Sequence, residues 1–298
     1  MTTGAGVDPA RLLREVSTVA VLELQSLAFG VRALLSLVLY GGFALIVATG
    51  YLFITDKIEE QVLNQNPALA QQDRKALLDQ MLKSDDFQKQ VMPVLEQVGG
   101  EAFAKSVAED SVPWIVIVLM LFTSLAIPGL VLVMTYDRIS EDLSTKYARF
   151  VLQRVHRGSY LFGKILGQWI TILVSMMLVH LLLLGLGAAL GKKIDTPRVL
   201  AVLPQVWLAL SVFVLAYTAL ASLFSALITP PFAALAFGGM ALMGLFVMKH
   251  LIAPFGMIWM GTWDTKLWFG EPAAFAVYAA HAVLLGAGAF AILRWRDV

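Results

Sequence analysis

The chain has 298 residues, of which 59% are hydrophobic and only 14% are charged, and its formal net charge is +1. An ordinary soluble domain contains about 25% charged residues, so this composition excludes a water-soluble protein and indicates a polytopic membrane protein. The sequence has no basic tail, which argues against nucleic-acid binding. It contains no cysteine, which excludes disulfide bonds and thiolate metal or redox chemistry.

Residues 1–32 are predicted to form a cytoplasmic interfacial helix. Asp8 can cap this helix, and Pro9 suits its first position. Apolar residues recur at helical spacing from Leu12 to Ala20, with charged residues on the opposite face. An amphipathic helix of this kind lies in the plane of the lipid headgroups instead of crossing the bilayer. An amphipathic leader without a role remains the alternative.

The remaining residues, 33–298, are predicted to form a transmembrane domain. A helix needs about 20 apolar residues to cross the hydrocarbon core, where its backbone must satisfy its own hydrogen bonds. Six segments qualify, namely 33–55, 112–136, 165–190, 199–228, 232–253 and 273–293. The predicted fold class is therefore an all-α polytopic membrane protein with six transmembrane helices.

The segment 56–111 is predicted to be a small helical insertion on the extracytoplasmic side, after the first span. Helix starts are predicted at Asn66 and Ser84, and a helix end at Gly99. A segment of about 55 residues forms only a marginal core by itself. We therefore expect it to pack on a second copy of the chain, on the membrane or on a partner. An inert cap and a gating or docking role both remain open.

The distribution of basic residues predicts the orientation. An even number of spans places both termini on one side of the membrane. Basic residues concentrate in the short segment 137–164, whereas the longer insertion 56–111 has more acidic than basic residues. Short loops rich in Lys and Arg stay in the cytoplasm, so both termini are predicted to be cytoplasmic. Lys192 and Lys193, in a predicted outer loop, argue the other way.

The outer loop 254–272 contains Trp259, Trp263 and Trp268. Tryptophan gathers at the membrane–water boundary because its ring is apolar and its N–H group needs a partner. We expect this loop to lie on the outer interface or to dip into it. An ordinary aromatic belt and a functional lid are both compatible with this pattern.

No catalytic or metal-binding motif is found in the sequence. The 4 histidines do not have the spacing of metal ligands. The segment from Gly187 to Lys193 resembles a phosphate-binding loop, but one residue is missing between its glycines and Lys193 stands where Ser or Thr binds magnesium. It also ends a span instead of joining a strand to a helix. The chain is therefore expected neither to bind ATP by a Walker motif nor to be an enzyme.

Polar side chains inside the predicted spans are few, and such groups often mark a substrate pathway. None of them is a carboxylate in the middle of a span, so the chain has no evident ion-driven energy source of its own. The candidates for a translocation path are Ser175, His180, Gln205, Ser211, Tyr217 and Thr218. Hydrogen bonding between neighbouring helices is the simpler role for each of them.

The charged segment 137–164 lies between two predicted spans and reads DRISEDLSTKYARFVLQRVHRGSYLFGK. Tyr147, Phe150 and Val151 form an apolar face at helical spacing, surrounded by basic and polar side chains. Gly158 then interrupts the helix. A solvated linker would need neither this length nor an apolar face. We therefore predict a short amphipathic cytoplasmic helix that binds a partner protein, and we name 137–164 the coupling segment.

The coupling segment resembles that of ABC type-2 permeases, the membrane subunits of exporters. These commonly carry D-x-I-S-x-E-x-x-x-G-T-x-R-F, two aliphatic residues, P-V-S-R and a final L-G-K. The matching residues here are Asp137, Ile139, Ser140, Asp142 in place of Glu, Arg149, Phe150, Val155, Arg157, Gly163 and Lys164. The chain departs from the pattern at Lys146-Tyr147 for Gly-Thr, at Arg154 for Pro and at His156 for Ser. The order of N-terminal helix, spans and outer insertion is similar along the whole chain.

The resemblance implies a homodimer of six-span subunits in the bacterial cytoplasmic (inner) membrane, each bound to a separate cytosolic ATP-binding-cassette ATPase. In that arrangement the ATPase binds ATP and Mg²⁺, this chain needs no cofactor or metal, and its short helix docks in a groove of the ATPase. The residues implied to couple the two proteins are Asp142, Tyr147, Arg149, Phe150, Arg154 and Arg157.

The leading hypothesis is a permease subunit that couples ATP hydrolysis by its partner to export of an amphipathic drug, peptide or lipid-like substrate. The alternative is mechanotransmission, in which nothing crosses the membrane and the ATPase moves segment 56–111 to drive an extracytoplasmic partner. A stand-alone channel or membrane enzyme is disfavoured because the sequence has neither pore charges nor a catalytic set.

Overall fold

The computed structural model describes residues 8–28, 30–65, 112–189 and 196–296, with a few more between 89 and 106. All regular elements in these ranges are helices, and no strand occurs in them. The helices predicted to begin at Asn66 and Ser84 lie outside the described residues, as does the predicted helix end at Gly99.

The helices differ widely in length. They are α1 (Pro9–Ala28), α2 (Val31–Gln65), α6 (Trp114–Thr135), α7 (Ser140–Ser144), α8 (Tyr147–Leu152), α9 (Arg157–Ala189), α10 (Thr196–Leu227), α11 (Pro231–Leu251), α12 (Ala253–Ile258), the 3-10 helix η3 (Met260–Thr262), α13 (Asp264–Trp268) and α14 (Pro272–Trp295). At 1.5 Å per residue, α2, α9 and α10 each extend about 50 Å, well beyond the ~30 Å of a hydrocarbon core. These three helices therefore continue into the aqueous regions.

Within the described ranges, 5 helices are long and apolar enough to span a membrane, and a shorter apolar stretch, Leu37–Gly50, lies inside α2. The five are Ile115–Ser144, Arg157–Leu186, Thr196–Leu227, Pro231–Lys249 and Pro272–Trp295. The predicted fold class, an all-α polytopic membrane protein, is confirmed.

Some helices extend past the predicted spans into polar sequence. α2 continues beyond Thr55 to Gln65, and α9 begins already at Arg157. The added residues of α2 are good helix formers, and Lys57 Nζ pairs with Glu60 Oε2 at 2.7 Å on the next turn. Hydropathy identifies the part of a helix that lies in hydrocarbon, so it does not mark where the helix itself ends.

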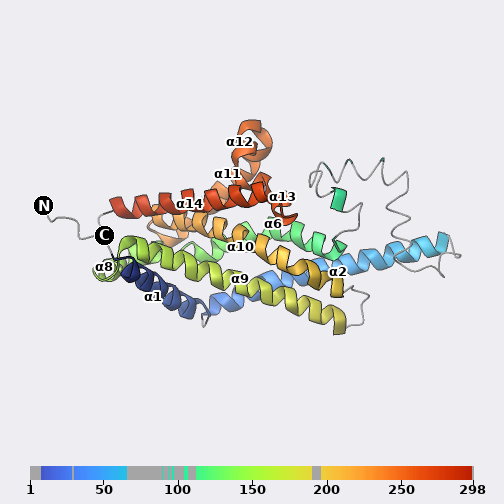
Figure 1. The fold of residues 1–298 in the computed structure, drawn as a ribbon, viewed down its shortest axis with the longest axis horizontal. Helices are drawn as coiled ribbons and strands as arrows, with labels where there is room; N and C mark the ends of the chain where they lie inside the picture. The colour runs from blue at the N-terminus through green and yellow to red at the C-terminus, as the bar shows by residue number, and fades with distance from the viewer. Residues whose placement is uncertain are drawn as a thin grey trace.

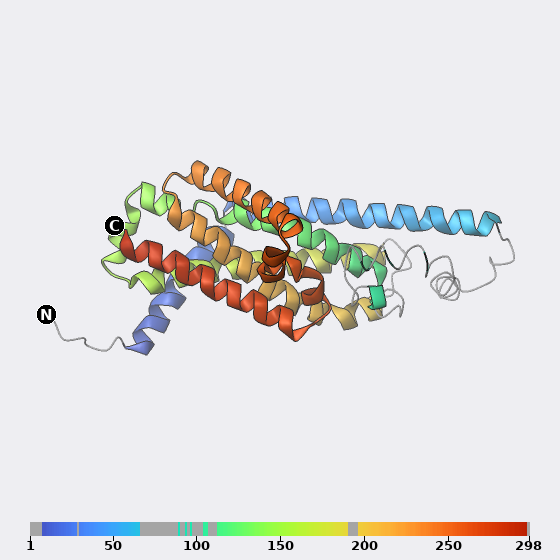
Figure 2. The same ribbon diagram turned by 90° about the horizontal axis from the view of Figure 1, so that it is seen from above.

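α10 is surrounded by other helices and packs against α6, α9, α11 and α14. α2 packs against α6 and α9, and α1 packs along the first part of α9 (Figures 1 and 2). Aromatic rings fill the centre of the largest buried cluster, where the ring centroid of Phe213 lies 5.5 Å from those of both Trp268 and Tyr278. This packing fixes the relative positions of α10, α13 and α14.

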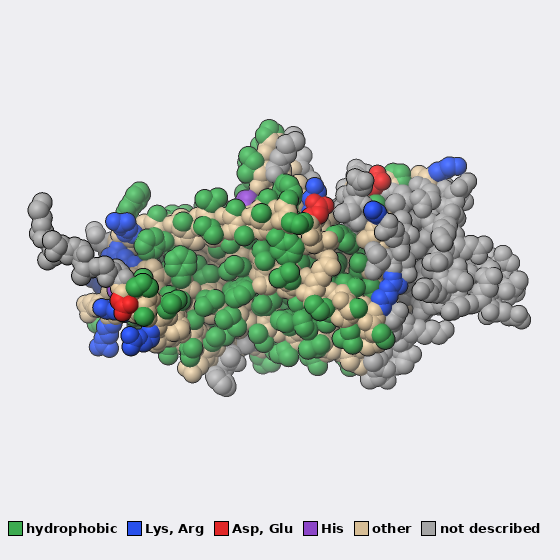
Figure 3. Space-filling view, in the orientation of Figure 1, with side chains coloured by type: hydrophobic (Ala, Val, Ile, Leu, Met, Phe, Trp, Pro, Cys, Tyr) green, Lys and Arg blue, Asp and Glu red, His purple; other side chains and the backbone are tan. Residues whose placement is uncertain are grey.

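The charged elements gather at one end of the bundle. Figures 1 and 2 place α7, α8, the start of α1 and the end of α14 at this end. Figure 3 shows Lys and Arg side chains there and a broad hydrophobic surface over the middle of the bundle. Charged groups are excluded from hydrocarbon, so this end lies in water. That it is the cytoplasmic end stays a prediction.

The segment between α11 and α14 folds into the bundle. Trp268 is only 1% exposed, and its Nε1 donates a hydrogen bond to Ser124 Oγ at 2.6 Å. Trp259 is also buried, and its ring stacks on that of Phe255. Trp268 therefore belongs to the protein core and not to a belt of tryptophans on the surface.

Candidate functional site

Two aromatic side chains of the coupling segment face away from the protein. Tyr147 and Phe150 lie one turn apart on α8, with 56% and 66% of their surface exposed. Arg149 and Arg154 are exposed as well. The opposite face of α8 is closed by Ala148, which is fully buried. We name Tyr147, Arg149, Phe150 and Arg154 the α8 surface.

The turn between α7 and α8 has an unusual backbone. Lys146, the residue before α8, has φ 61° and ψ 10° and is the one non-glycine residue with positive φ in the described ranges. This left-handed conformation costs a residue with a Cβ atom about 1–2 kcal/mol. Glycine, which the similar family pattern carries at this position, has no such cost. The departure at Lys146 therefore leaves the left-handed turn in place.

Asp142, predicted to couple the chain to its partner, points inward and links α7 to α9. Its Oδ2 atom accepts a hydrogen bond from the Tyr160 hydroxyl at 2.6 Å and pairs with Lys164 Nζ at 2.8 Å. Tyr160 is 1% exposed. The carboxylate of Asp142 therefore holds α7 against the first turns of α9.

Arg157, another predicted coupling residue, joins α9 to α14. Its Nη1 atom donates to the carbonyl oxygens of Leu293, Arg294 and Arg296 at 3.0, 2.6 and 3.3 Å. The last carbonyl oxygens of a helix have no partner within the helix, and a cation there is stabilised by the helix dipole. Of the six predicted coupling residues, four thus form the α8 surface and two anchor the coupling segment to the bundle.

α1 contacts the coupling segment through Glu15, which sequence reasoning missed. Glu15 Oε2 accepts hydrogen bonds from the backbone N–H of His156 at 3.0 Å and from His156 Nδ1 at 2.9 Å. Glu15 Oε1 accepts one from Arg11 Nε at 3.0 Å. The backbone hydrogen bond from His156, helped by these side-chain bonds, lowers the pKa of Glu15 to about 2. Glu15 therefore fixes the residue that directly precedes α9.

A second contact of α1 is a buried group of charges. Glu23 is 6% exposed, and its carboxylate lies 3.5 Å from Arg138 Nε and 3.6 Å from Lys164 Nζ. Gln168 Nε2 donates to the same carboxylate at 3.4 Å. Lys164 Nζ also donates to the Arg138 carbonyl oxygen at 2.7 Å. Removing one partner from a buried ion pair costs about 3–5 kcal/mol, so this group holds α1, α9 and the turn after α6 together.

Two glycines of α9 allow α1 to approach closely. A Cβ atom on Gly163 would lie 2.6 Å from Val19 Cβ, and one on Gly167 would lie 2.7 Å from Glu23 Cβ. Both distances are shorter than real carbon–carbon contacts, so a larger residue would push α1 away. The Gly-x-x-x-Gly spacing is typical of closely packed membrane helices. It is the signal in the sequence that could have predicted this contact.

A separate polar group lies near α13, away from the coupling segment. The Tyr278 hydroxyl donates a hydrogen bond to Asp264 Oδ1, and Lys249 Nζ donates to the carbonyl oxygen of Gly261 at 3.2 Å. Burial raises the pKa of Asp264 to about 7, although the bond from Tyr278 opposes this shift. These bonds fix the segment between α11 and α14 against the bundle.

The residues predicted to line a translocation path do not converge on one site. On α10, Gln205 Nε2 donates to the carbonyl oxygen of Trp268 at 3.2 Å. Thr218 Oγ1 donates to a carbonyl oxygen of its own helix at 2.8 Å. The ring centroid of Tyr217 lies 4.9 Å from that of Phe213, inside the aromatic cluster. Gln205 and Tyr217 therefore both contact the aromatic cluster around Phe213 and Trp268, whereas Thr218 bonds within its own helix.

Of the six, His180 lines the cavity that the described residues form between four of the helices. The carbonyl oxygen of Ser211 accepts a hydrogen bond from Trp169 Nε1 at 2.7 Å, and Ser175 is buried. His180 is thus the one of the six that lies at this cavity, and the path itself stays a prediction.

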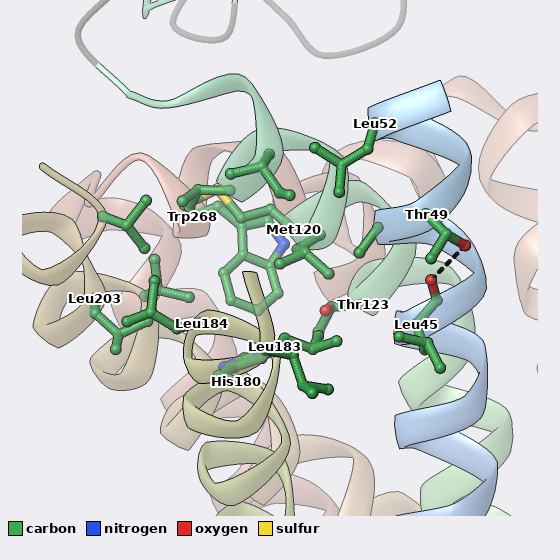
Figure 4. Close-up of a pocket in the computed structure, with 17 residues that line it drawn as sticks. Leu45, Thr49, Leu52, Met120, Thr123, His180, Leu183, Leu184, Leu203 and Trp268 are labelled. Atoms are coloured by element: carbon green, nitrogen blue, oxygen red, sulfur yellow. Dashed lines mark hydrogen bonds between the residues drawn. The ribbon is translucent and has the colours of Figure 1, made fainter. Parts of the chain in front are cut away.

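The cavity measures about 90 Å³ and lies between α2, α6, α9 and α10, next to Trp268 (Figure 4). Its lining is apolar except for Thr49, Thr123 and His180. The hydroxyl of Tyr40 lies 2.9 Å from His180 Nε2 and 3.1 Å from Thr123 Oγ1, so α2, α6 and α9 meet in one hydrogen-bonded group. Among the described residues that line this cavity there is no Asp, Glu, Lys or Arg.

These features define a multi-pass α-helical membrane protein with an exposed aromatic and basic surface at the charged end of its bundle. A comparison with protein families is more specific, because the model of the ABC-2 family transporter proteins matches residues 48–280. The chain belongs to this family and is thus a membrane subunit of an ABC transporter, whose ATPase is a separate partner. The matched range includes the whole coupling segment, whereas α1 lies before the matched range. No curated protein matches the chain.

Proposed function

We propose that this chain is the permease subunit of an ATP-driven exporter and binds a cytosolic ATPase through the α8 surface. The observation that carries the proposal is the exposure of Tyr147 and Phe150 in water, with Arg149 and Arg154 beside them. Aromatic and Arg side chains are the residues most enriched at the energetically important centres of protein interfaces. The combination of Tyr147 and Phe150 with the two arginines on the α8 surface therefore favours a protein partner over lipid.

Motion of the α8 surface would reach the membrane helices through the buried contacts of the coupling segment. Asp142 and Lys164 join α7 to α9, and Glu15 and Glu23 join α1 to both ends of the segment. Closure of two ATPase subunits around ATP and Mg²⁺ would then tilt α9 and α1 together. A homodimer in the bacterial cytoplasmic membrane, with both termini in the cytoplasm, is the assembly in which two such surfaces face an ATPase pair.

The substrate class that the bundle favours is an amphipathic drug, peptide or lipid-like molecule. The described lining of the cavity beside His180 is apolar and does not contain the charged side chains that an ion pathway needs. This chain would contribute the path and the coupling surface, and the ATPase would contribute the chemistry.

The test is to measure ATPase binding by variants of the α8 surface. Phe150→Asp and Arg149→Glu are each expected to reduce co-purification of the ATPase encoded beside this chain by about tenfold or more, and to abolish substrate-stimulated ATP hydrolysis. Trp295→Asp is the matched control, because Trp295 is 85% exposed at the same end of the bundle but belongs to α14. Undiminished binding and hydrolysis in both α8 variants would rule out docking through this surface.

Mechanotransmission is the second candidate function, and the length of α2 favours it. α2 continues as a helix to Gln65, beyond its apolar stretch Leu37–Gly50, and so connects the bundle directly to segment 56–111. Deleting residues 66–107 is expected to abolish activity if the segment drives an outer partner. Export of a small amphiphile by the deletion variant would decide in favour of transport.

A further inference from the structure

The apolar face of α8 and of the residues after it covers the charged end of the bundle. Val151, Leu152 and Val155 pack against a buried cluster that contains Ala226 of α10 and Leu293 of α14. Ala226 and Leu293 both lie in the last turn of their helices. Because α8 covers these helix ends, its opposite face points away from the membrane and into water.

Three cations stand on this outward face or directly beside it. Lys146 is the residue before α8, Arg149 lies within the helix, and Arg154 follows its end. All three are exposed, and Figure 3 shows Lys and Arg side chains gathered at this end of the bundle. We name these three residues the cationic rim. The exposed rings of Tyr147 and Phe150 stand between them in the chain.

The cationic rim has no acidic partner within the described residues. Arg138 and Lys164, in the same part of the structure, form ion pairs, whereas none of the three rim residues does so there. Asp142 lies one turn before Lys146 but pairs with Lys164 instead. Lys146 and Arg149 are three residues apart, a spacing at which like charges repel on a helix. The positive charge of the rim is therefore not compensated inside this part of the chain.

The charges and rings together define the surface that would complement them. Protein interfaces place aromatic side chains in desolvated pockets and match a positive patch with a negative one. Tyr147 and Phe150 therefore need an apolar floor, and the cationic rim needs carboxylates around that floor. An anionic membrane surface would also supply negative charge, but the outward face of α8 points away from the bilayer.

We propose that the α8 surface docks in a groove that has an apolar floor and Asp or Glu side chains at its edge, and that the cationic rim selects this groove. The inference rests on the proposed function, because the ATPase is the partner that would carry the groove. Lys146 and Arg154 stand where the similar family pattern has Gly and Pro, so two of the three charges are particular to this chain. An ATPase with a neutral or basic groove edge would bind more weakly, because like charges across an interface are unfavourable.

The first experiment measures how fast the purified ATPase encoded beside this chain associates with the full-length permease in nanodiscs. Salt screens the attraction between the rim and carboxylates, so the association rate should fall roughly tenfold between about 0.05 and 0.3 M salt. An association rate that does not depend on salt would overturn the proposal.

Neutral variants assign this salt dependence to the rim. Lys146→Gln with Arg154→Gln should lower the association rate at low salt about threefold to tenfold and flatten its salt dependence. Arg294→Gln is the matched control, because Arg294 is exposed at the same end of the bundle but belongs to α14. An equal effect of the control and the double variant would show that the rim has no special role.

Charge reversal identifies the residues opposite the rim. Arg154→Glu should weaken ATPase binding about tenfold or more, because it places a carboxylate against the acidic groove edge. Replacing one Asp or Glu of the ATPase by Arg should restore binding to this variant and weaken binding to the unmodified permease. A scan of every Asp and Glu of the ATPase without such a rescue would contradict the pairing.

A fluorescent label separates contact with protein from contact with anionic lipid. The sequence has no cysteine, so Gln153→Cys, exposed at the end of α8, gives a single attachment site for bimane. Its emission should shift to shorter wavelength when the ATPase is added, in nanodiscs of phosphatidylcholine and of phosphatidylglycerol alike. A shift caused by phosphatidylglycerol without the ATPase would assign the rim to lipid and overturn the proposal.

Failure of this inference and failure of the proposed function give different results. If Phe150→Asp leaves ATPase binding unchanged, the proposed function loses its docking surface, whatever the salt dependence. If Phe150→Asp abolishes binding but salt and charge reversal have no effect, docking through α8 stands and the acidic groove is wrong.

Discussion

At the scale of single residues, the coupling segment contains two kinds of side chain. Phe150 and Tyr147 are exposed and contribute little to the packing of the bundle, whereas Asp142 and Arg157 make internal hydrogen bonds. Substitution of the exposed pair should therefore alter partner binding in a folded protein. Substitution of the internal pair should destabilise the charged end of the bundle itself.

The backbone at Lys146 predicts a stabilising substitution. In Lys146→Gly the left-handed conformation stays, but its cost of about 1–2 kcal/mol is removed. The flexibility of glycine in the unfolded chain offsets about half of this gain. We expect a net gain of up to about 1 kcal/mol, measured by thermal unfolding in detergent. Lys146→Ala removes the same charge but keeps Cβ, so it should give no gain. Equal stability of the two variants would contradict this reason.

Glu15 predicts a dependence of stability on pH. Its pKa in the folded protein, about 2, lies below the ordinary value of 4.5, so its contribution to stability is complete above pH 4.5 and is lost as the pH falls toward 2. Glu15→Gln should therefore lower the unfolding temperature at neutral pH and have little effect near pH 2. Thermal unfolding across this range measures the difference. Glu141→Gln, at an exposed site on α7, is the control and should show no such trend.

Only part of the exposure pattern of the coupling segment could be predicted from the sequence. The apolar spacing placed Tyr147, Phe150 and Val151 on one face of a helix. Tyr147 and Phe150 are exposed, whereas Val151 packs against the buried cluster around Tyr160. The same spacing could not show that Asp142 and Arg157 point inward, because their partners Lys164 and Leu293 come from other helices. Such pairings depend on helix packing, which no local pattern contains.

At the scale of secondary structure, α1 is more than an amphipathic helix beside a membrane. It packs along α9, where Gly163 and Gly167 allow close approach, and its acidic residues Glu15 and Glu23 reach the coupling segment. The amphipathic pattern predicted the helix but not this neighbour. A charged side chain on a solvated face of an interfacial helix would be exposed, whereas Glu23 is buried.

The close contact between α1 and α9 predicts that one methyl group added to α9 weakens the contact strongly. Gly163→Ala places a Cβ atom 2.6 Å from Val19 Cβ, and overpacking of this kind costs about 1–3 kcal/mol. Hydrogen exchange of α1 should become faster in this variant. Gly185→Ala, on the same helix with no atom within 4 Å of the added Cβ, should not change it. Equal exchange in both variants would show that α1 does not depend on this groove.

The positions of the membrane helices were largely predictable, and their pairings were not. Long apolar runs identify hydrocarbon-spanning helices because the bilayer demands them. Trp268 shows the limit of this reasoning, since tryptophan at a membrane boundary favours the surface whereas Trp268 is in the core. Its Nε1 atom is satisfied by Ser124 of α6, a partner far away in the sequence.

At the scale of the whole molecule, contacts among the described residues connect the charged end of the bundle to the far end of α2. The coupling segment, which includes the α8 surface, is joined to α1 by the bonds between Glu15 and His156. α2 begins shortly after α1 ends and continues to Gln65. A helix transmits displacement along its axis only while its hydrogen bonds are intact. The outer part of α2 is therefore the element on which mechanotransmission depends.

Breaking the outer part of α2 tests this connection. Lys57→Gly with Glu60→Gly should reduce helix stability by about 1 kcal/mol at each site and uncouple segment 56–111 from the bundle. Lys57→Ala with Glu60→Ala also removes the ion pair but keeps the helix. If segment 56–111 is driven mechanically, the glycine pair should lose outer activity while ATP hydrolysis continues. Similar activity of both pairs would exclude that role.

The three carbonyl oxygens bound by Arg157 tie the last residues of α14 to the start of α9. α14 therefore follows a displacement of the coupling segment at this end. Its other end begins at Pro272, just after Trp268 beside the cavity, and Tyr278 holds that end against the bundle. We therefore expect a push on the coupling segment to reach the indole wall of the cavity through α14.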